Sequence, residues 1–142
     1  MSLEERTGTR DLTYSRWHRP KSIRRYLSVE QAAKLTVIDI DWCEACWRCA
    51  APLALIETQR STKGPKNARI MTELAKLAQL PAFSVGYHVG EVGGEEDCIA
   101  FYVTQLWPYA DARRVVTMTA QQYAEWLWSL RSKHECAGEA AA

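Results

Sequence analysis

The sequence predicts an α/β (α+β) domain in which a central mixed four-stranded sheet, including one β-hairpin, is flanked by helices. Two apolar runs rich in β-branched residues stand a few residues apart in the first half of the chain, which favours an antiparallel hairpin. Capping-box patterns open two helices, and a third helical stretch separates the hairpin from two further strands. The predicted order is therefore helix, hairpin, helix, two strands and helix.

The first half of the chain supplies a short helix and the hairpin. Ser28 begins a capping-box pattern that opens the helix. Alternating β-branched residues predict a strand over residues 36–45, and an apolar run predicts the second strand over residues 52–59. Residues 46–51 then form the turn that joins the two strands.

The second half supplies two helices and two strands. Apolar residues recur at helical spacing over residues 68–78, which predicts an amphipathic helix. The runs over residues 83–89 and 98–107 predict strands, joined by a loop rich in glycine and acidic residues. Thr119 opens a capping box for the closing helix, which carries an apolar stripe.

Length and composition indicate one globular domain. The 142 residues are 47% hydrophobic and 25% charged, the balance of a chain that buries a single core. A net charge of +1 excludes a histone-like polyelectrolyte. The longest apolar run falls far short of the roughly 20 residues that span a bilayer, so no membrane partner is expected. Five cysteines, an odd number, favour reduced thiols in a cytoplasm over a secreted disulfide framework.

Residues 1–27 form a basic arm in which aromatic side chains alternate with cations. Such a pattern suits contact with backbone phosphates and stacking on bases, so we expect nucleic acid as a partner. The alternative is a solvated segment whose aromatic residues dock onto the core. The candidate nucleic-acid-binding residues are Arg16, Arg19, Lys21, Arg24, Arg25 and Trp17.

Acidic residues gather on the two strands of the predicted hairpin. Asp39 and Asp41 share one face of the first strand, and Glu57 and Gln59 share one face of the second. A turn centred near residues 48–49 would set Asp41 almost opposite Glu57. Carboxylates amid apolar residues need a cation or a proton, and a hard ion such as Mg²⁺ meets that need. The alternative is that these side chains line the solvent face of a half-exposed sheet.

Three motifs, IDIDW, PLALIETQ and LAKLAQLPAFSVGY, resemble the PD-(D/E)XK nuclease superfamily, most closely its small phage-associated members. The resemblance spans roughly Thr36 to Tyr87, and it implies a restriction-endonuclease-like core over residues 28–134. The last residues, ECAGEAAA, predict a disordered tail over 135–142. It implies that Asp41 and Glu57 bind Mg²⁺ or Mn²⁺, with Asp39 as an alternate ligand and the Thr58 carbonyl as a further one.

Gln59 stands where that superfamily most often has a lysine. Lysine helps to orient the attacking water and stabilises the phosphate in the transition state, whereas glutamine can orient water but brings no net charge. Some active members of the superfamily are similar in having glutamine at this position. The leading hypothesis is a metal-dependent deoxyribonuclease, and the first alternative is a catalytically inactive nucleic-acid-binding module with the same fold.

Three cysteines, Cys43, Cys46 and Cys49, recur at intervals of three residues and resemble part of a zinc or iron–sulfur ligand run. Cys46 and Cys49 flank the tip of the predicted hairpin, which supplies half of a zinc site. Free thiols, or small buried apolar residues, are the alternative. A further functional alternative is a zinc-stabilised interaction protein that serves a phage.

We expect the partner to be nucleic acid, in the first place DNA. A homodimer is a second kind of assembly that the sequence allows. The expected compartment is the cytoplasm, which would be the host cytoplasm for a phage-encoded chain.

Overall fold

The computed structural model describes residues 13–18, 25–35, 38, 40–60, 67–109 and 114–137. The chain divides into two compact units, Met1–Asp39 and Ile40–Ala142.

The first unit contains two short helices, α1 (Thr13–His18) and α2 (Val29–Lys34). The capping box predicted for α2 is confirmed, because the Gln31 amide donates to Ser28 Oγ at 3.1 Å and the Ser28 amide donates to Gln31 Oε1 at 3.1 Å.

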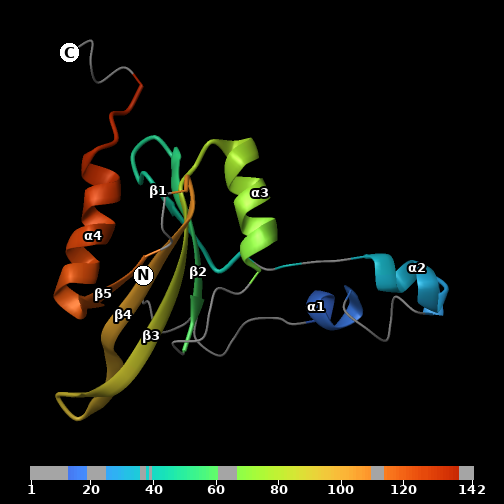
Figure 1. Cartoon of the computed structure of the whole chain (residues 1–142), viewed down its shortest axis with the longest axis horizontal. Helices are drawn as coiled ribbons and strands as arrows, with labels where there is room; N and C mark the ends of the chain where they lie inside the picture. Colours follow the sequence, from blue (N-terminus) through green and yellow to red (C-terminus); the bar gives the residue numbers. More distant parts are fainter. Residues whose placement is uncertain are drawn as a thin grey trace. The chain divides into compact units, whose positions relative to one another are not determined.

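The second unit is an α+β sheet domain. Its mixed sheet has the order β1-β2-β3-β4-β5, where the strands are β1 (Trp42–Ala45), β2 (Pro52–Gln59), β3 (Ala82–Val92), β4 (Glu95–Trp107) and β5 (Val115–Thr119). The strands pair antiparallel except β2 and β3, which run parallel because α3 (Ala68–Ala78) connects them. The prediction of a mixed sheet with helices is confirmed, but the predicted number of four strands is wrong (Figure 1).

The hairpin β1–β2 has the predicted turn over residues 46–51. The Ala50 amide donates to the Cys46 carbonyl at 2.8 Å, and the Cys46 amide donates to the Ala51 carbonyl at 2.8 Å. Strand β1 is shorter than predicted, since it begins at Trp42 rather than at residue 36.

The second hairpin, β3–β4, replaces the predicted loop. Gly93 and Gly94 have φ angles of 61° and 86°, so they form a two-residue turn that only glycine and a few polar residues adopt readily. Both strands consequently continue to the turn, and the acidic residues between 91 and 97 lie on strands.

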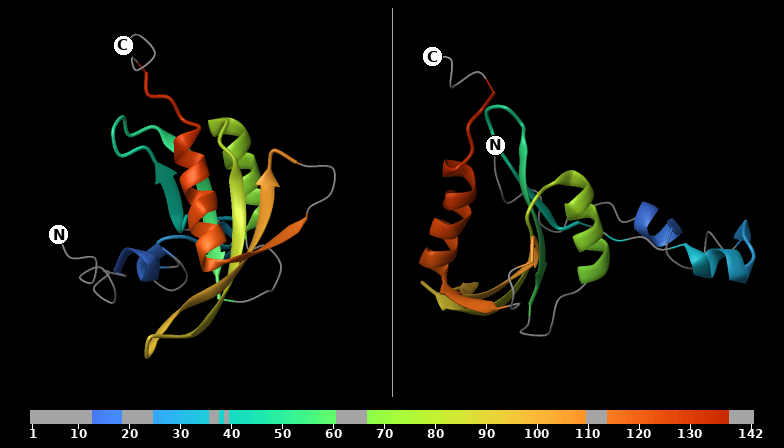
Figure 2. Two further views of the ribbon diagram at one scale, coloured as in Figure 1. Left: turned by 90° about the vertical axis from the view of Figure 1, so that its left-hand side faces the viewer. Right: turned by 45° about the horizontal axis from the view of Figure 1, so that its top comes forward.

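Two helices cover opposite faces of the sheet (Figures 1 and 2). Helix α4 (Ala120–Ser132) begins at the predicted capping box of Thr119 and packs on the core cluster of Ile56, Phe83 and Val85. Trp126 meets Phe83 edge to face with ring centroids 4.8 Å apart. Helix α3 buries Met71, Thr72 and Ala75 on the other side.

Candidate functional site

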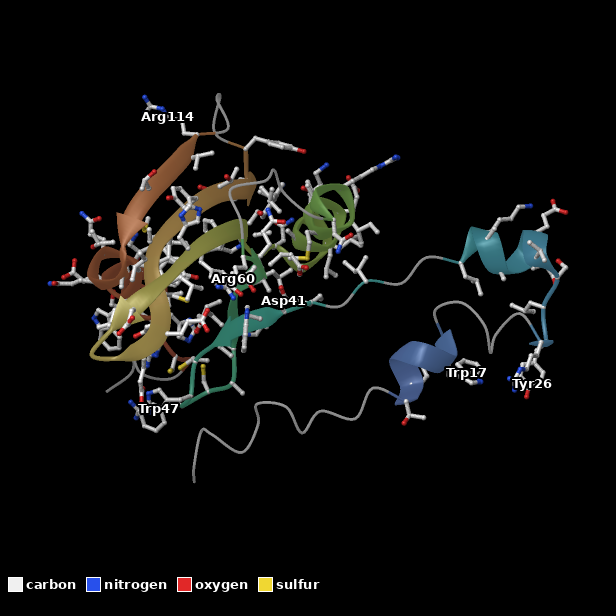
Figure 3. All side chains as sticks on the ribbon, turned by 90° about the horizontal axis from the view of Figure 1, so that it is seen from below. Trp17, Tyr26, Asp41, Trp47, Arg60 and Arg114 are labelled. Carbon is white, nitrogen blue, oxygen red and sulfur yellow. The ribbon has the colours of Figure 1, made fainter. Side chains whose placement is uncertain are left out.

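The β1–β2 hairpin carries chemically useful side chains at both of its ends. Asp41 precedes β1 at the open end, and Trp47 marks the tip where Cys46 and Cys49 lie (Figure 3).

Asp41 is held against strand β2 at the open end of the hairpin. Trp42 pairs with Ile56, and continuing this antiparallel register by one residue sets Asp41 opposite Glu57. Asp41 Oδ2 accepts hydrogen bonds from the Thr58 amide at 2.9 Å and from Thr58 Oγ1 at 3.1 Å. Hydrogen bonds to an ionised acceptor are the stronger kind, so these two bonds fix the orientation of the Asp41 carboxylate.

Glu57 is buried, with 2% of its surface exposed. Its neighbours in register are Ser84 on β3 and, beyond it, Thr104 on β4, and both are also buried. Residues paired across strands share a face of the sheet, so these three form a buried polar row. The row lies on the face opposite the one that packs against α4, because Glu57 follows Ile56 and side chains alternate.

The other predicted site residues are placed only in part. Gln59 is half-buried on β2, two residues beyond Glu57 and hence on the same face of the sheet. Asp39 lies outside the described residues.

The basic arm belongs to the first unit. Arg25 is exposed, and Trp17 is 41% exposed and lies beside Tyr14 with ring centroids 5.9 Å apart. The remaining predicted phosphate contacts fall outside the described side chains, namely Arg16, Arg19, Lys21 and Arg24.

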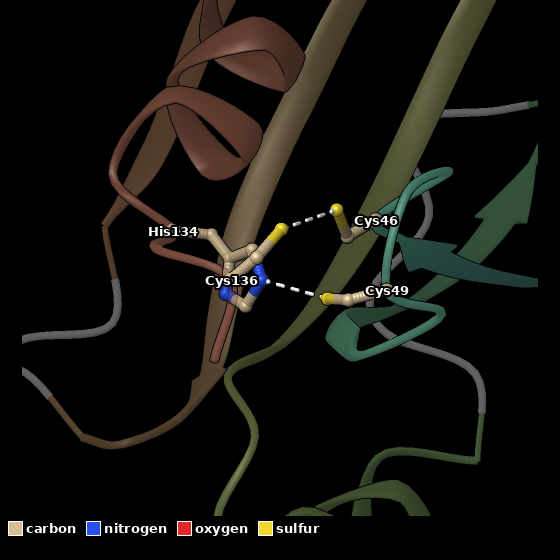
Figure 4. Close-up of side chains that lie close together, drawn as sticks. All are labelled: Cys46, Cys49, His134 and Cys136. Carbon is tan, nitrogen blue, oxygen red and sulfur yellow. Dashed lines mark hydrogen bonds between the residues drawn. The ribbon is translucent and has the colours of Figure 1, made fainter. Parts of the chain in front are cut away.

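Four potential metal ligands converge at the tip of the hairpin. The ligand atoms of Cys46, Cys49, His134 and Cys136 all lie within 4.8 Å of one another. Cys46 Sγ is 3.6 Å from Cys136 Sγ, and Cys49 Sγ is 3.1 Å from His134 Nε2 (Figure 4). We call these four residues the Cys/His cluster. Within the described ranges it is the only group of three or more His, Cys, Asp or Glu side chains that could hold a metal ion.

Local hydrogen bonds place both halves of the Cys/His cluster. The tight turn closed by the Cys46 carbonyl brings Cys46 and Cys49 to one side of the tip. At the other half, the His134 amide donates to the Arg131 carbonyl at 3.1 Å, and Arg131 Nη1 donates to the His134 carbonyl at 3.3 Å. These bonds fold the chain back just after α4, so His134 and Cys136 face the tip.

The thiols of the cluster differ in acidity. A backbone hydrogen bond from Cys49 lowers the pKa of Cys46 to about 7, although burial opposes this shift. Burial raises the pKa of Cys136 to about 12, and the adjacent thiols of Cys49 and Cys46 add to the increase. One thiol of the cluster therefore ionises near neutral pH, and the thiolate is the form that binds metals.

The structure changes the predicted set of cysteine ligands. Cys46 and Cys49 belong to the cluster, whereas Cys43 is exposed and directs its Sγ to the Glu44 carbonyl at 3.8 Å. Sequence reasoning did not predict His134 as a ligand, and it assigned Cys136 to the predicted disordered tail over residues 135–142, although Cys136 is buried in the cluster. The signal that could have revealed them is the His-x-Cys spacing just after the closing helix.

A cavity of about 430 Å³ lies on the α4 face, next to Thr58. Its lining is largely apolar and includes four aromatic side chains, Trp42, Tyr87, Phe101 and Tyr123. Such a surface can receive a flat aromatic group by stacking.

No family model, curated protein or solved structure matches this chain. Among the helices of the described ranges, none has the length and apolarity needed to cross a membrane.

Proposed function

We propose that this chain is a metal-dependent nuclease in which Asp41 and Glu57 hold Mg²⁺ or Mn²⁺ for cleavage of DNA. The observation that carries the proposal is the hairpin register, in which Trp42 pairs with Ile56, so that extending it by one residue would pair Asp41 with Glu57. Directly opposite residues of a regular antiparallel pair have Cβ atoms about 5 Å apart, and the Asp41 carboxylate is directed to Thr58, the residue next to Glu57.

The burial of Glu57 supports a cation at this place. A carboxylate that is 2% exposed loses its hydration, and a bound cation offsets that cost. Oxygen donors are the ligands that Mg²⁺ and Mn²⁺ prefer. Bound there, such an ion supplies an acidic water and stabilises charge on the phosphate.

The protein residues around the ion have separate roles in this proposal. Asp41 and Glu57 supply carboxylate oxygens, and the resemblance to the PD-(D/E)XK superfamily adds the Thr58 carbonyl as a further ligand. Gln59, on the same strand face as Glu57, orients the attacking water through its side-chain amide. The basic arm binds backbone phosphates of the substrate, which makes binding dependent on salt.

The test is a cleavage assay on single- and double-stranded DNA and on RNA, with Mg²⁺ or Mn²⁺ and with chelator. We expect metal-dependent cleavage of DNA by the wild-type chain and loss of cleavage in Glu57→Gln and Asp41→Asn. Glu73→Gln, which changes an exposed carboxylate on α3, serves as the matched control and should cleave normally. Cleavage that persists unchanged in Glu57→Gln would show that the activity does not come from this site.

A second candidate function, nucleic-acid binding without cleavage, is favoured by Gln59 in place of the usual lysine. The substitution Gln59→Lys separates the two candidates. For an inactive descendant of a nuclease, restoring the positive charge should produce cleavage that the wild type lacks, because the charge stabilises the developing negative charge on phosphate. If the wild type cleaves and Gln59→Lys changes the rate little, the first candidate is favoured.

A further inference from the structure

We propose that the Cys/His cluster binds one Zn²⁺ as a closed structural site that joins the tip of the β1–β2 hairpin to the segment after α4. This inference is independent of the proposed nuclease function, because the cluster lies at the opposite end of the hairpin from Asp41 (Figures 3 and 4).

The spacing of the ligand atoms fits a single zinc ion. With Zn–S bonds of about 2.3 Å and a Zn–N bond of about 2.0 Å, a regular tetrahedron sets neighbouring ligand atoms about 3.5–3.8 Å apart. The distance from Cys46 Sγ to Cys136 Sγ is 3.6 Å, and every pair of ligand atoms lies within 4.8 Å. The same 3.6 Å is far longer than the roughly 2.0 Å of a disulfide bond, and all five cysteines of the chain are free thiols.

The chemistry of the donors selects zinc over the hard cations. Three thiols and one imidazole are soft or borderline ligands, which Zn²⁺ prefers and Mg²⁺ does not. Four protein ligands complete a tetrahedron and leave no position for water or substrate. A zinc ion held by Cys₃His is therefore structural rather than catalytic.

The position of the cluster shows what the ion would stabilise. Cys46 and Cys136 are 1% and 5% exposed, whereas His134 is half-buried and Cys49 is exposed, so one side of the cluster is buried and the other side, at Cys49, is open to solvent. The ligands come from two pairs that are 85–90 residues apart in sequence. Closing so long a loop costs entropy, which metal–ligand bonds offset in the folded state.

Metal analysis of the full chain tests the proposal. We expect about one zinc per chain in protein purified with reductant, and a cobalt-substituted form with the absorption bands of a tetrahedral thiolate site. Cys46→Ser and Cys136→Ser should lose the metal and lower the unfolding temperature. Cys43→Ser and Cys98→Ser are the matched controls, because both cysteines lie outside the cluster, and they should keep the metal.

His134→Cys covers the case in which the serine variants fail to fold. This variant should still bind one metal ion, now with four thiolates, and its cobalt spectrum should show stronger charge-transfer absorption than the wild type. The proposal is overturned if the wild type binds no zinc after reconstitution, if it carries iron instead, or if Cys43→Ser removes the metal while Cys46→Ser keeps it.

Discussion

At the scale of single residues, Glu57 combines full burial with an ionisable carboxyl group. In the described part of the chain, it is the only buried aspartate or glutamate. Its companions in the polar row, Ser84 and Thr104, are hydroxyl residues. The effective penalty for burying an ion is several kcal/mol, and a bound cation is one way to offset that penalty.

Replacing Glu57 by glutamine tests this reasoning through stability rather than activity. The variant keeps the size of the side chain and removes the carboxylate. Without divalent metal, we therefore expect its free energy of unfolding to be equal to that of the wild type or higher by up to about 1 kcal/mol. Mg²⁺ should stabilise the wild type, because a ligand that binds the folded state shifts the equilibrium, and should leave Glu57→Gln unchanged. Urea unfolding with and without Mg²⁺ measures both effects. An equal response to Mg²⁺ in both proteins would contradict the assignment.

The acidity of the thiols sets a pH dependence for zinc binding. The pKa of Cys136 is about 12 without metal, so this thiol holds its proton at neutral pH and must release it when zinc binds. Zinc affinity should therefore fall as the pH falls, and rise as the pH rises. Competition with a chromophoric chelator at about pH 6, 7 and 8 measures this trend, and weakly buffered titration measures the released protons. An affinity that is constant over this range argues against thiolate ligands.

At the scale of elements, the sequence predicted best those helices and turns that local chemistry determines. The capping boxes at Ser28 and Thr119 start helices because side chain and backbone satisfy each other within four residues. Strand β5 was not predicted, because a strand of five residues depends on pairing with the open edge of β4 as well as on its own β-branched run, VVTMT.

The cap of α4 gives a prediction at this scale. Thr119→Ala removes the side-chain acceptor for the Gln122 amide, at 3.2 Å, and should lower the free energy of unfolding by about 1 kcal/mol. Thr117→Ala, two residues earlier on β5, changes a neighbouring exposed threonine and should have a smaller effect. Urea unfolding followed by circular dichroism compares the two. Equal losses of stability would show that the cap contributes nothing specific to α4.

At the scale of the whole molecule, the candidate metal centre was only half predictable. Cys46 and Cys49 are close in sequence, so a hairpin alone brings them together. His134 and Cys136 join them only after the sheet and α4 have assembled, and sequence spacing carries no information about that packing. The register of Asp41 and Glu57 could be predicted from sequence more directly than the Cys/His cluster. The length of a single turn determines which residues lie opposite each other in a hairpin.

The basic arm gives a prediction for the full chain. Under the proposed function, replacing Arg24 and Arg25 by alanine should weaken DNA binding for all sequences. The slope of the logarithm of affinity against the logarithm of salt concentration should become shallower by about one for each lost phosphate contact. Fluorescence anisotropy at several salt concentrations measures this slope. Lys133→Ala, at the end of α4, is an exposed control. Unchanged affinity and slope in the double variant would exclude the arm as a phosphate-binding segment.

The tip after β1 lies against the segment after α4, and this affects how the second unit comes apart. Strand β1 and helix α4 are the first and last regular elements of that unit, and terminal elements are normally where a domain frays and where proteases begin. Under the proposed zinc site, an ion bound to Cys46 and Cys136 would close the chain between these two residues into a ring. Digestion within residues 46–136 would then have to start at an internal loop, and removal of the ion should make both ends of this segment accessible to proteases.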